Sequence, residues 1–154
     1  FGGFLSARTF HCPVISIILL ILISLLLLIC YLKDYNTAIK NNWKMSLPKG
    51  HRKELISTNS ESSFLGDGHR YHVFVYKEKP KQNNFDNYKS TKDISVETEV
   101  QKILKSLDIS QQNRPDFSKE YYWYMKSDAS DFRNKLYLIY IVEDNQIYVI
   151  EEFY

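Results

Sequence analysis

The chain has 154 residues and a mass of 18.3 kDa, which suffices for one domain of ordinary size. Because 44% of the residues are hydrophobic and 15% are aromatic, the composition excludes disorder for most of the chain. The formal net charge is only +2, which excludes a strongly basic nucleic-acid-binding tail and an acidic solvating protein.

The first element is an apolar segment near the N-terminus. After a tail of residues 1–13, Val14 to Leu32 form nineteen consecutive residues without a charge. A helix of this length rises about 28 Å, close to the ~30 Å hydrocarbon core of a bilayer. We therefore expect a single transmembrane helix over 14–32 and a location in the cell membrane. A cleaved signal peptide is less favoured because its apolar region is usually about 7–15 residues long.

Residues 33–53 contain six basic side chains and one acidic one, and they include a turn signal at Pro48-Lys49-Gly50. We interpret this segment as a basic juxtamembrane linker whose lysines meet anionic lipid. A solvated linker with incidental charge is an equally good reading. The candidate membrane-surface contacts are Lys33, Lys40, Trp43, Lys44, Lys49, Arg52 and Lys53.

Two rules disagree about orientation. The basic flank after Leu32 places the following domain in the cytosol by the positive-inside rule. Long domains, however, translocate largely regardless of charge, and a short N-terminal tail ordinarily stays inside. We expect an extracytoplasmic domain. The abundance of Lys, Asn, Ile and Tyr indicates an AT-rich bacterial genome.

Residues 54–154 form the expected folded domain. They carry thirteen basic and seventeen acidic side chains, a formal net charge of −4, which disfavours nucleic acid as a partner. Both cysteines, Cys12 and Cys30, precede this domain. The domain therefore has no disulfide, thiol nucleophile or thiolate metal site.

The domain begins with a predicted hairpin. Residues 54–65 are Ser/Thr-rich and extended, and 69–76 alternate β-branched and aromatic side chains. Between them lie Gly66, Asp67 and Gly68, and Asp-Gly is suited to the positive φ angles of a tight turn. The strand at 69–76 is apolar on both faces, so we expect a central place in its sheet.

The rest of the domain predicts one helix and three strands. Residues 79–94 are polar and form a loop, and Ser95 caps a helix with an apolar stripe ending at Leu107. Strands follow at 120–125, 136–142 and 147–154, the last two joined by a turn at Asp144-Asn145. The predicted fold is α+β: a transmembrane helix, then an antiparallel sheet of about five strands (β-β-α-β-β-β) with one packed helix.

Few residues suggest catalysis or metal binding. His69 and His72 are three residues apart on a strand and point to opposite faces, so one metal ion would not bind both. Asp67 and His69 are able to meet at the rim of the turn, although turn geometry alone explains the aspartate. No nucleophile elbow, phosphate-binding loop or metal motif is present, so we expect no cofactor.

Aromatic side chains are frequent on the predicted strands. Half of them will form the core beneath the helix. Because one helix covers one face of a sheet, we expect Tyr122, Tyr124 and Tyr137 on the uncovered face, where they are candidate interface residues.

The run Ser63-Phe64-Leu65-Gly66-Asp67-Gly68, the aromatic strand after it and the closing LYLIYIVEDNQIYVIEE resemble a group of small, uncharacterised single-span membrane proteins of Gram-positive bacteria. The resemblance covers residues 55–78 and 120–152. It departs from the group at Ser62-Ser63, where the group tends towards His-Gly-Gly. The resemblance implies an extracytoplasmic, membrane-anchored protein and no particular reaction.

Two functions follow as hypotheses. The favoured one is a membrane-anchored, non-catalytic domain that binds a protein or a cell-envelope component through an exposed sheet face or edge. The alternative is a small envelope hydrolase that uses carboxylate chemistry near Asp67. A cleft that holds Asp67, His69 and a second carboxylate within hydrogen-bond reach would favour the hydrolase.

Overall fold

The computed structural model describes residues 13–32, 35–60 and 68–154. The chain divides into two compact units, Phe1–Ser46 and Leu47–Tyr154. Each unit is described by itself.

The first unit contains two helices, α1 (Pro13–Leu32) and α2 (Tyr35–Trp43). The apolar side chains described along α1, from Ile17 to Ile29, are exposed. Among the helices whose residues the structure describes, none combines the length and the apolar character needed to cross a membrane. The linker interpretation missed α2, because YNTAIKNNW is short and has a single apolar pair at helical spacing, Ile39 and Trp43, both of which are buried.

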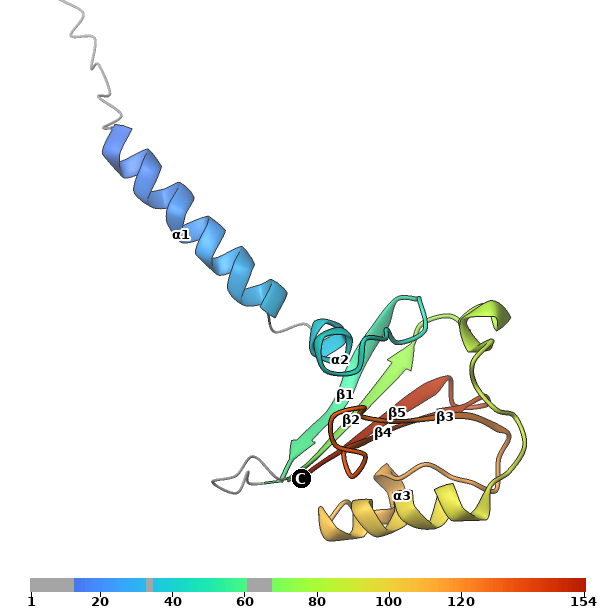
Figure 1. The fold of residues 1–154 in the computed structure, drawn as a ribbon. Coiled ribbons are helices and arrows are strands. Elements are labelled where there is room, and N and C mark those ends of the chain that lie inside the picture. The colour runs from blue at the N-terminus through green and yellow to red at the C-terminus, as the bar shows by residue number, and fades with distance from the viewer. Residues whose placement is uncertain (1–12, 33–34, 61–67) are drawn as a thin grey trace, which may run out of the picture. The chain divides into compact units, whose positions relative to one another are not determined.

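The second unit is built on one antiparallel sheet (Figure 1). The order across the sheet is β1-β2-β5-β4-β3, so that the last strand lies in the middle. This confirms the predicted α+β class with five antiparallel strands. The strands are β1 (Arg52–Asn59), β2 (Gly68–Tyr76), β3 (Tyr121–Ser127), β4 (Lys135–Ile141) and β5 (Gln146–Phe153).

The two hairpins differ in their turns. β4 and β5 join through a tight turn in which Asn145 adopts φ 54°, as the Asp-Asn pair predicts. The Asn145 amide also accepts a hydrogen bond from Tyr140 and donates one to the Tyr76 carbonyl, both at 2.7 Å. The first hairpin forms as well, with Asn59 paired with Arg70 and the Ser60 amide donating to the His69 carbonyl at 2.9 Å. A two-residue turn at Asp67-Gly68 would place residue 66 opposite His69, so the predicted turn does not close this hairpin, and Gly68 is the first residue of β2. Gly66 and Asp67 lie outside the described residues.

The main helix, α3 (Ile94–Ser106), covers one face of the sheet (Figure 1). Its N-cap is Asp93, whose carboxylate accepts hydrogen bonds from the backbone amides of Ser95 and Val96. The prediction of Ser95 as the cap was therefore two residues late. Aspartate and serine are both good caps, so that composition alone does not choose between them.

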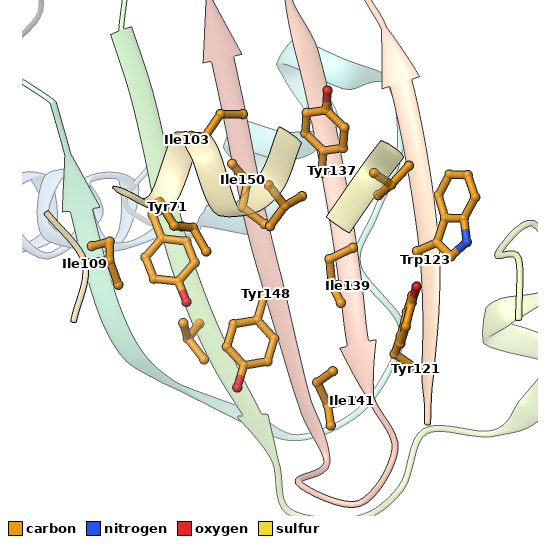
Figure 2. Packing of buried hydrophobic residues seen from close by; sticks show 14 residues of the cluster. Tyr71, Ile103, Ile109, Tyr121, Trp123, Tyr137, Ile139, Ile141, Tyr148 and Ile150 are labelled. Atoms are coloured by element: carbon orange, nitrogen blue, oxygen red, sulfur yellow. The ribbon is translucent and has the colours of Figure 1, made fainter. Parts of the chain in front are cut away.

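The core lies between α3 and the facing side of the sheet (Figure 2). Figure 2 shows Tyr148 and Ile150 of β5 flanked by β2 and β4 side chains that point to the same side. Val100, Ile103 and Leu104 reach this layer from α3 and are buried. The apolar stripe predicted for the helix therefore faces the core.

The opposite face of the sheet is also buried over its centre, where Leu138, Tyr140 and Val149 are almost inaccessible to solvent. The short 3-10 helix η1 (Gln82–Phe85) contributes to this, because the Phe85 ring stacks on Tyr140 at 4.6 Å. The expectation of an uncovered aromatic face is therefore wrong. Residues 79–94, predicted as a loop, supply part of the cover.

Candidate functional site

An open groove of about 910 Å³ lies beside α3 in the second unit, and we call it the α3 groove. Three segments form its walls: the first half of α3, the connection between α3 and β3, and the β4–β5 turn with the start of β5. Its lining residues are Glu97, Thr98, Gln101, Gln111, Gln112, Arg114, Pro115, Asp116, Phe117, Lys119, Asp144, Gln146 and Tyr148.

The connection between α3 and β3 forms one wall because it is fastened along its length. Figure 1 shows it returning beside α3 towards β3. The Tyr71 hydroxyl of β2 donates a hydrogen bond to the Asn113 carbonyl, and Arg114 Nε donates one to the Ile109 carbonyl at 2.7 Å. Gln101 Nε2 approaches the Pro115 carbonyl at 3.5 Å. These contacts tie the loop to both the sheet and the helix.

Hydrogen bonds within the protein orient three polar side chains of the α3 groove. Lys119 Nζ donates to Asp144 Oδ1 at 2.6 Å, and the Tyr148 hydroxyl donates to Gln146 Oε1 at 2.8 Å. The Tyr121 hydroxyl donates to Glu97 Oε1 at 2.6 Å. The acceptor in each bond is one oxygen of a planar carboxylate or amide. Because the group is planar, the bond also fixes the position of its second oxygen or its nitrogen.

Four titratable groups in or beside the α3 groove have shifted pKa values. The hydrogen bond to Asp144 raises the pKa of Lys119, which keeps the ammonium charged. Burial, with the hydrogen bond to Glu97, raises the pKa of Tyr121 to about 12, and burial raises that of Tyr148 to about 12. Hydrogen bonds from Ser118 lower the pKa of Asp116. None of these shifts moves a pKa towards neutrality.

A second, smaller cleft of about 170 Å³ lies where β2 and β5 meet the second half of α3. His69 Nε2 is 3.5 Å from Glu152 Oε1, and the Tyr154 hydroxyl donates to the same oxygen at 2.9 Å. Glu99 and Lys102 of α3 also line this cleft. The cleft thus brings His69 together with Glu152 and Glu99, two carboxylates of the kind that a hydrolase would need.

The two histidines of β2 lie on opposite faces, as expected. His69 faces α3 and Glu152, whereas His72 Nδ1 is 2.5 Å from Glu54 Oε1 on the other face. Burial lowers the pKa of His72, and the Glu54 hydrogen bond opposes that shift. Within the described ranges, no three His, Cys, Asp or Glu side chains are grouped as a metal site requires.

The predicted membrane-surface residues fall into four groups. Trp43 is only 2% exposed, so its proposed place at the lipid headgroups is wrong; as part of α2 it buries the same helix face as Ile39. Arg52 is half-buried, with its guanidinium 5.7 Å from the centre of the Phe74 ring. Lys33 lies outside the described residues. Those that are exposed are Lys40, Lys44, Lys49 and Lys53.

The predicted interface aromatics also separate. Tyr137 pairs with Met125 and is 3% exposed in the core beneath α3, so its assignment to the other face is wrong. Tyr122 and Tyr124 do lie on that other face. They are half-buried, with Phe85 stacked at 5.5 Å from Tyr122 and Tyr88 at 5.8 Å from Tyr124. The rings of Phe85 and Tyr88 therefore cover part of the face on which Tyr122 and Tyr124 lie.

The sequence interpretation missed the α3 groove altogether. Its polar residues come from a non-periodic connection and a turn, which carry no motif. The available signal was compositional. Gln111 and Gln112 stand beside an Arg-Pro pair in a mostly polar segment of thirteen residues, Asp108 to Glu120, and a strand follows this segment directly. Long ordered connections of this kind often carry function.

A comparison with models of protein families finds no match for this chain, and comparisons with curated proteins and with solved structures find none either. The likeness to single-span proteins of Gram-positive bacteria therefore stays a prediction.

Proposed function

We propose that the protein is a membrane-anchored, non-catalytic binding module whose second unit holds a component of the cell envelope in the α3 groove. The observation that carries this proposal is the groove itself. A volume of about 910 Å³ is at the upper end of the range for ligand sites, and its polar side chains are oriented before any ligand arrives.

The membrane anchor is proposed from residues 14–32. Their uncharged sequence is long enough to cross the hydrocarbon core. The apolar side chains described on α1 are exposed over several turns, and lipid is the solvent that suits such a surface. Exposed Lys40, Lys44, Lys49 and Lys53 then provide positive charge for anionic headgroups.

Membrane attachment is tested by alkaline washing of membranes from cells that express the full chain. The parent chain is expected to stay in the membrane pellet, and the pair Leu22→Arg and Leu26→Arg is expected to release it. Two arginines placed at exposed Asn41 and Asn42 are the matched control and should leave the pellet fraction unchanged. Equal release of both double variants would reject the anchor.

The proposed orientation places the second unit outside the cytoplasm. Protease added to intact protoplasts is expected to digest the region after residue 33 and to leave an N-terminal fragment in the membrane. Complete protection until the membrane is permeabilised would place this unit in the cytosol.

Binding is favoured over catalysis in the α3 groove by the ionisation of its side chains. A general acid or base works best with a pKa near the working pH. The pKa values of two lining side chains, Lys119 and Tyr148, are instead raised further above neutrality. Such side chains suit fixed hydrogen bonding better than proton transfer.

Sedimentation with purified Gram-positive cell walls tests the binding function. The detergent-solubilised full chain is expected to sediment with the walls. Gln112→Trp, which fills the α3 groove, is expected to abolish this, whereas Gln82→Trp places the same ring at an exposed glutamine on η1 and should not. Equal retention of both variants would contradict binding in the groove.

The hydrolase stays the second candidate function because His69 and Glu152 share a cleft with Glu99. It predicts that cell walls release soluble fragments in the presence of the protein, and that Glu152→Gln stops the release while Gln112→Trp does not. Glu78→Gln, at an exposed carboxylate, is the control. An absence of any release from walls that bind the protein would reject the hydrolase.

A further inference from the structure

We infer that the α3 groove recognises a neutral oligosaccharide. This inference rests on the proposed function and names the chemical class of its ligand.

The charge of the lining argues against an ionic ligand. Three acidic and two basic side chains give a formal net charge of −1. Lys119 and Asp144 already neutralise each other at 2.6 Å, and Glu97 accepts a hydrogen bond from Tyr121. An anionic polymer would meet no excess of positive charge here, and a cation would have to compete with Lys119 for Asp144.

The side chains that line the groove offer both hydrogen-bond donors and hydrogen-bond acceptors. Four glutamines line the groove: Gln101, Gln111, Gln112 and Gln146. An amide side chain both donates and accepts hydrogen bonds, as a sugar hydroxyl does. Gln146 Oε1 is engaged by Tyr148 and Gln101 Nε2 by the Pro115 carbonyl. These two contacts leave a donor on Gln146 and an acceptor on Gln101.

The planar carboxylate and amide groups of the lining favour a ligand that has hydroxyl groups on adjacent carbon atoms. Glu97, Asp144, Gln101 and Gln146 each hold one atom in a contact within the protein and keep a second atom at a fixed position. A sugar ring presents adjacent hydroxyl groups that donate and accept at once. Because the protein groups are already ordered, binding costs little side-chain entropy.

The side chains that are missing argue against a peptide. Among the described residues that line the groove there is no Ala, Val, Leu, Ile or Met, and the non-polar contacts come from Pro115, Phe117 and Tyr148. Peptide recognition depends on apolar anchors in pockets or on a free strand edge. The walls are a helix, a fastened loop and a turn, so they offer neither. A sugar ring requires only a flat apolar surface for its C–H face, and the Phe117 ring supplies one.

The test is NMR titration of the isotope-labelled full chain in phosphocholine micelles, since this detergent has no sugar headgroup. The probes are tetraacetylchitotetraose, cellotetraose and maltotetraose. We expect at least one of them to shift amide signals of Gln101, Gln111, Gln112 and Gln146 and to leave those of β1 unchanged. Raising the salt from about 50 mM to about 500 mM should alter the Kd by less than about twofold, because the ligand is uncharged.

Variants then assign the contacts. Gln101→Ala and Gln112→Ala are each expected to weaken binding by about threefold to tenfold, the usual effect of one lost hydrogen bond. Gln82→Ala is the matched control and should bind as the parent does. An unchanged amide spectrum away from the substitution shows that each variant is folded.

Two results would overturn the inference. One is an absence of shifts in the groove at about 10 mM of all three sugars, well above a millimolar Kd. The other is that tetra-alanine or tetragalacturonate shifts the groove signals at lower concentration than any neutral sugar, which would make the ligand a peptide or an anion. Either result together with retained sedimentation on cell walls would leave the proposed function standing and reject only the sugar.

Discussion

Replacing Leu104 by alanine tests how α3 is held on the sheet. Leu104 is completely buried in the core cluster, on the helix face that contacts the strands. The substitution removes roughly three carbon groups at ~0.8 kcal/mol each, about 2.4 kcal/mol of transfer free energy. The cavity that remains adds to this, so that the free energy of unfolding should fall by about 3–4 kcal/mol.

A fragment of residues 47–154 suits this measurement, because it is the second compact unit and keeps Trp123 as its one tryptophan. Urea unfolding followed by Trp123 fluorescence gives the midpoint and the slope for each variant. Leu55→Ala is the control, since Leu55 is 49% exposed at the β1 bulge and should cost less than about 1 kcal/mol. A loss below about 1 kcal/mol for Leu104→Ala would refute the packing of α3 described here.

Three further outcomes are expected. Tyr71→Phe should lower the free energy of unfolding by about 1 kcal/mol and speed amide hydrogen exchange near Asn113, because it releases one wall of the groove; unchanged exchange there would contradict that role. Burial lowers the pKa of His72 below its ordinary 6.5, so the unfolded chain binds more protons on acidification and stability is lost as the pH falls below about 6.5. His72→Gln should reduce the change in melting temperature between about pH 7.5 and 5.5. If the variant shows the same pH dependence as the parent, His72 is excluded as the cause. Asn145→Ala should destabilise the chain more than Asn145→Gly does, since alanine also opposes the positive φ, and calorimetric melting checks the order.

Local patterns predicted most of the strands and the helix. The alternation in 69–76 and the turn at Asp144-Asn145 placed β2 and the last hairpin within a residue or two. The sequence did not predict that β5 pairs with β2. The two strands are far apart in the chain, and several strands are apolar enough to pair with β2 or with β5. Pairing of this kind is decided by the complete core.

The errors have local causes. β4 reads KLYLIYI and is apolar on both faces, so the alternation does not say which face Tyr137 occupies. Phe85 covers the second face from a segment with no periodicity, and for that reason the sequence suggested an open surface. The α3 groove was out of reach because its residues become neighbours only when the connection after α3 is tied back by Tyr71 and Arg114.

Because β5 is both the central strand and the last one in the chain, the sheet is completed only at the end of synthesis. During translation, the β1–β2 hairpin and α3 leave the ribosome before the strand that joins β2 to β4 exists. Until β5 is made, the inner edge of β2 has no partner strand and the apolar side chains of both half-sheets are exposed. A chain interrupted shortly before residue 146 would thus have two separate half-sheets, and quality-control proteases would be expected to remove it rapidly. For the same reason, a tag inserted in the β4–β5 turn should impair folding far more than one placed after Gly50.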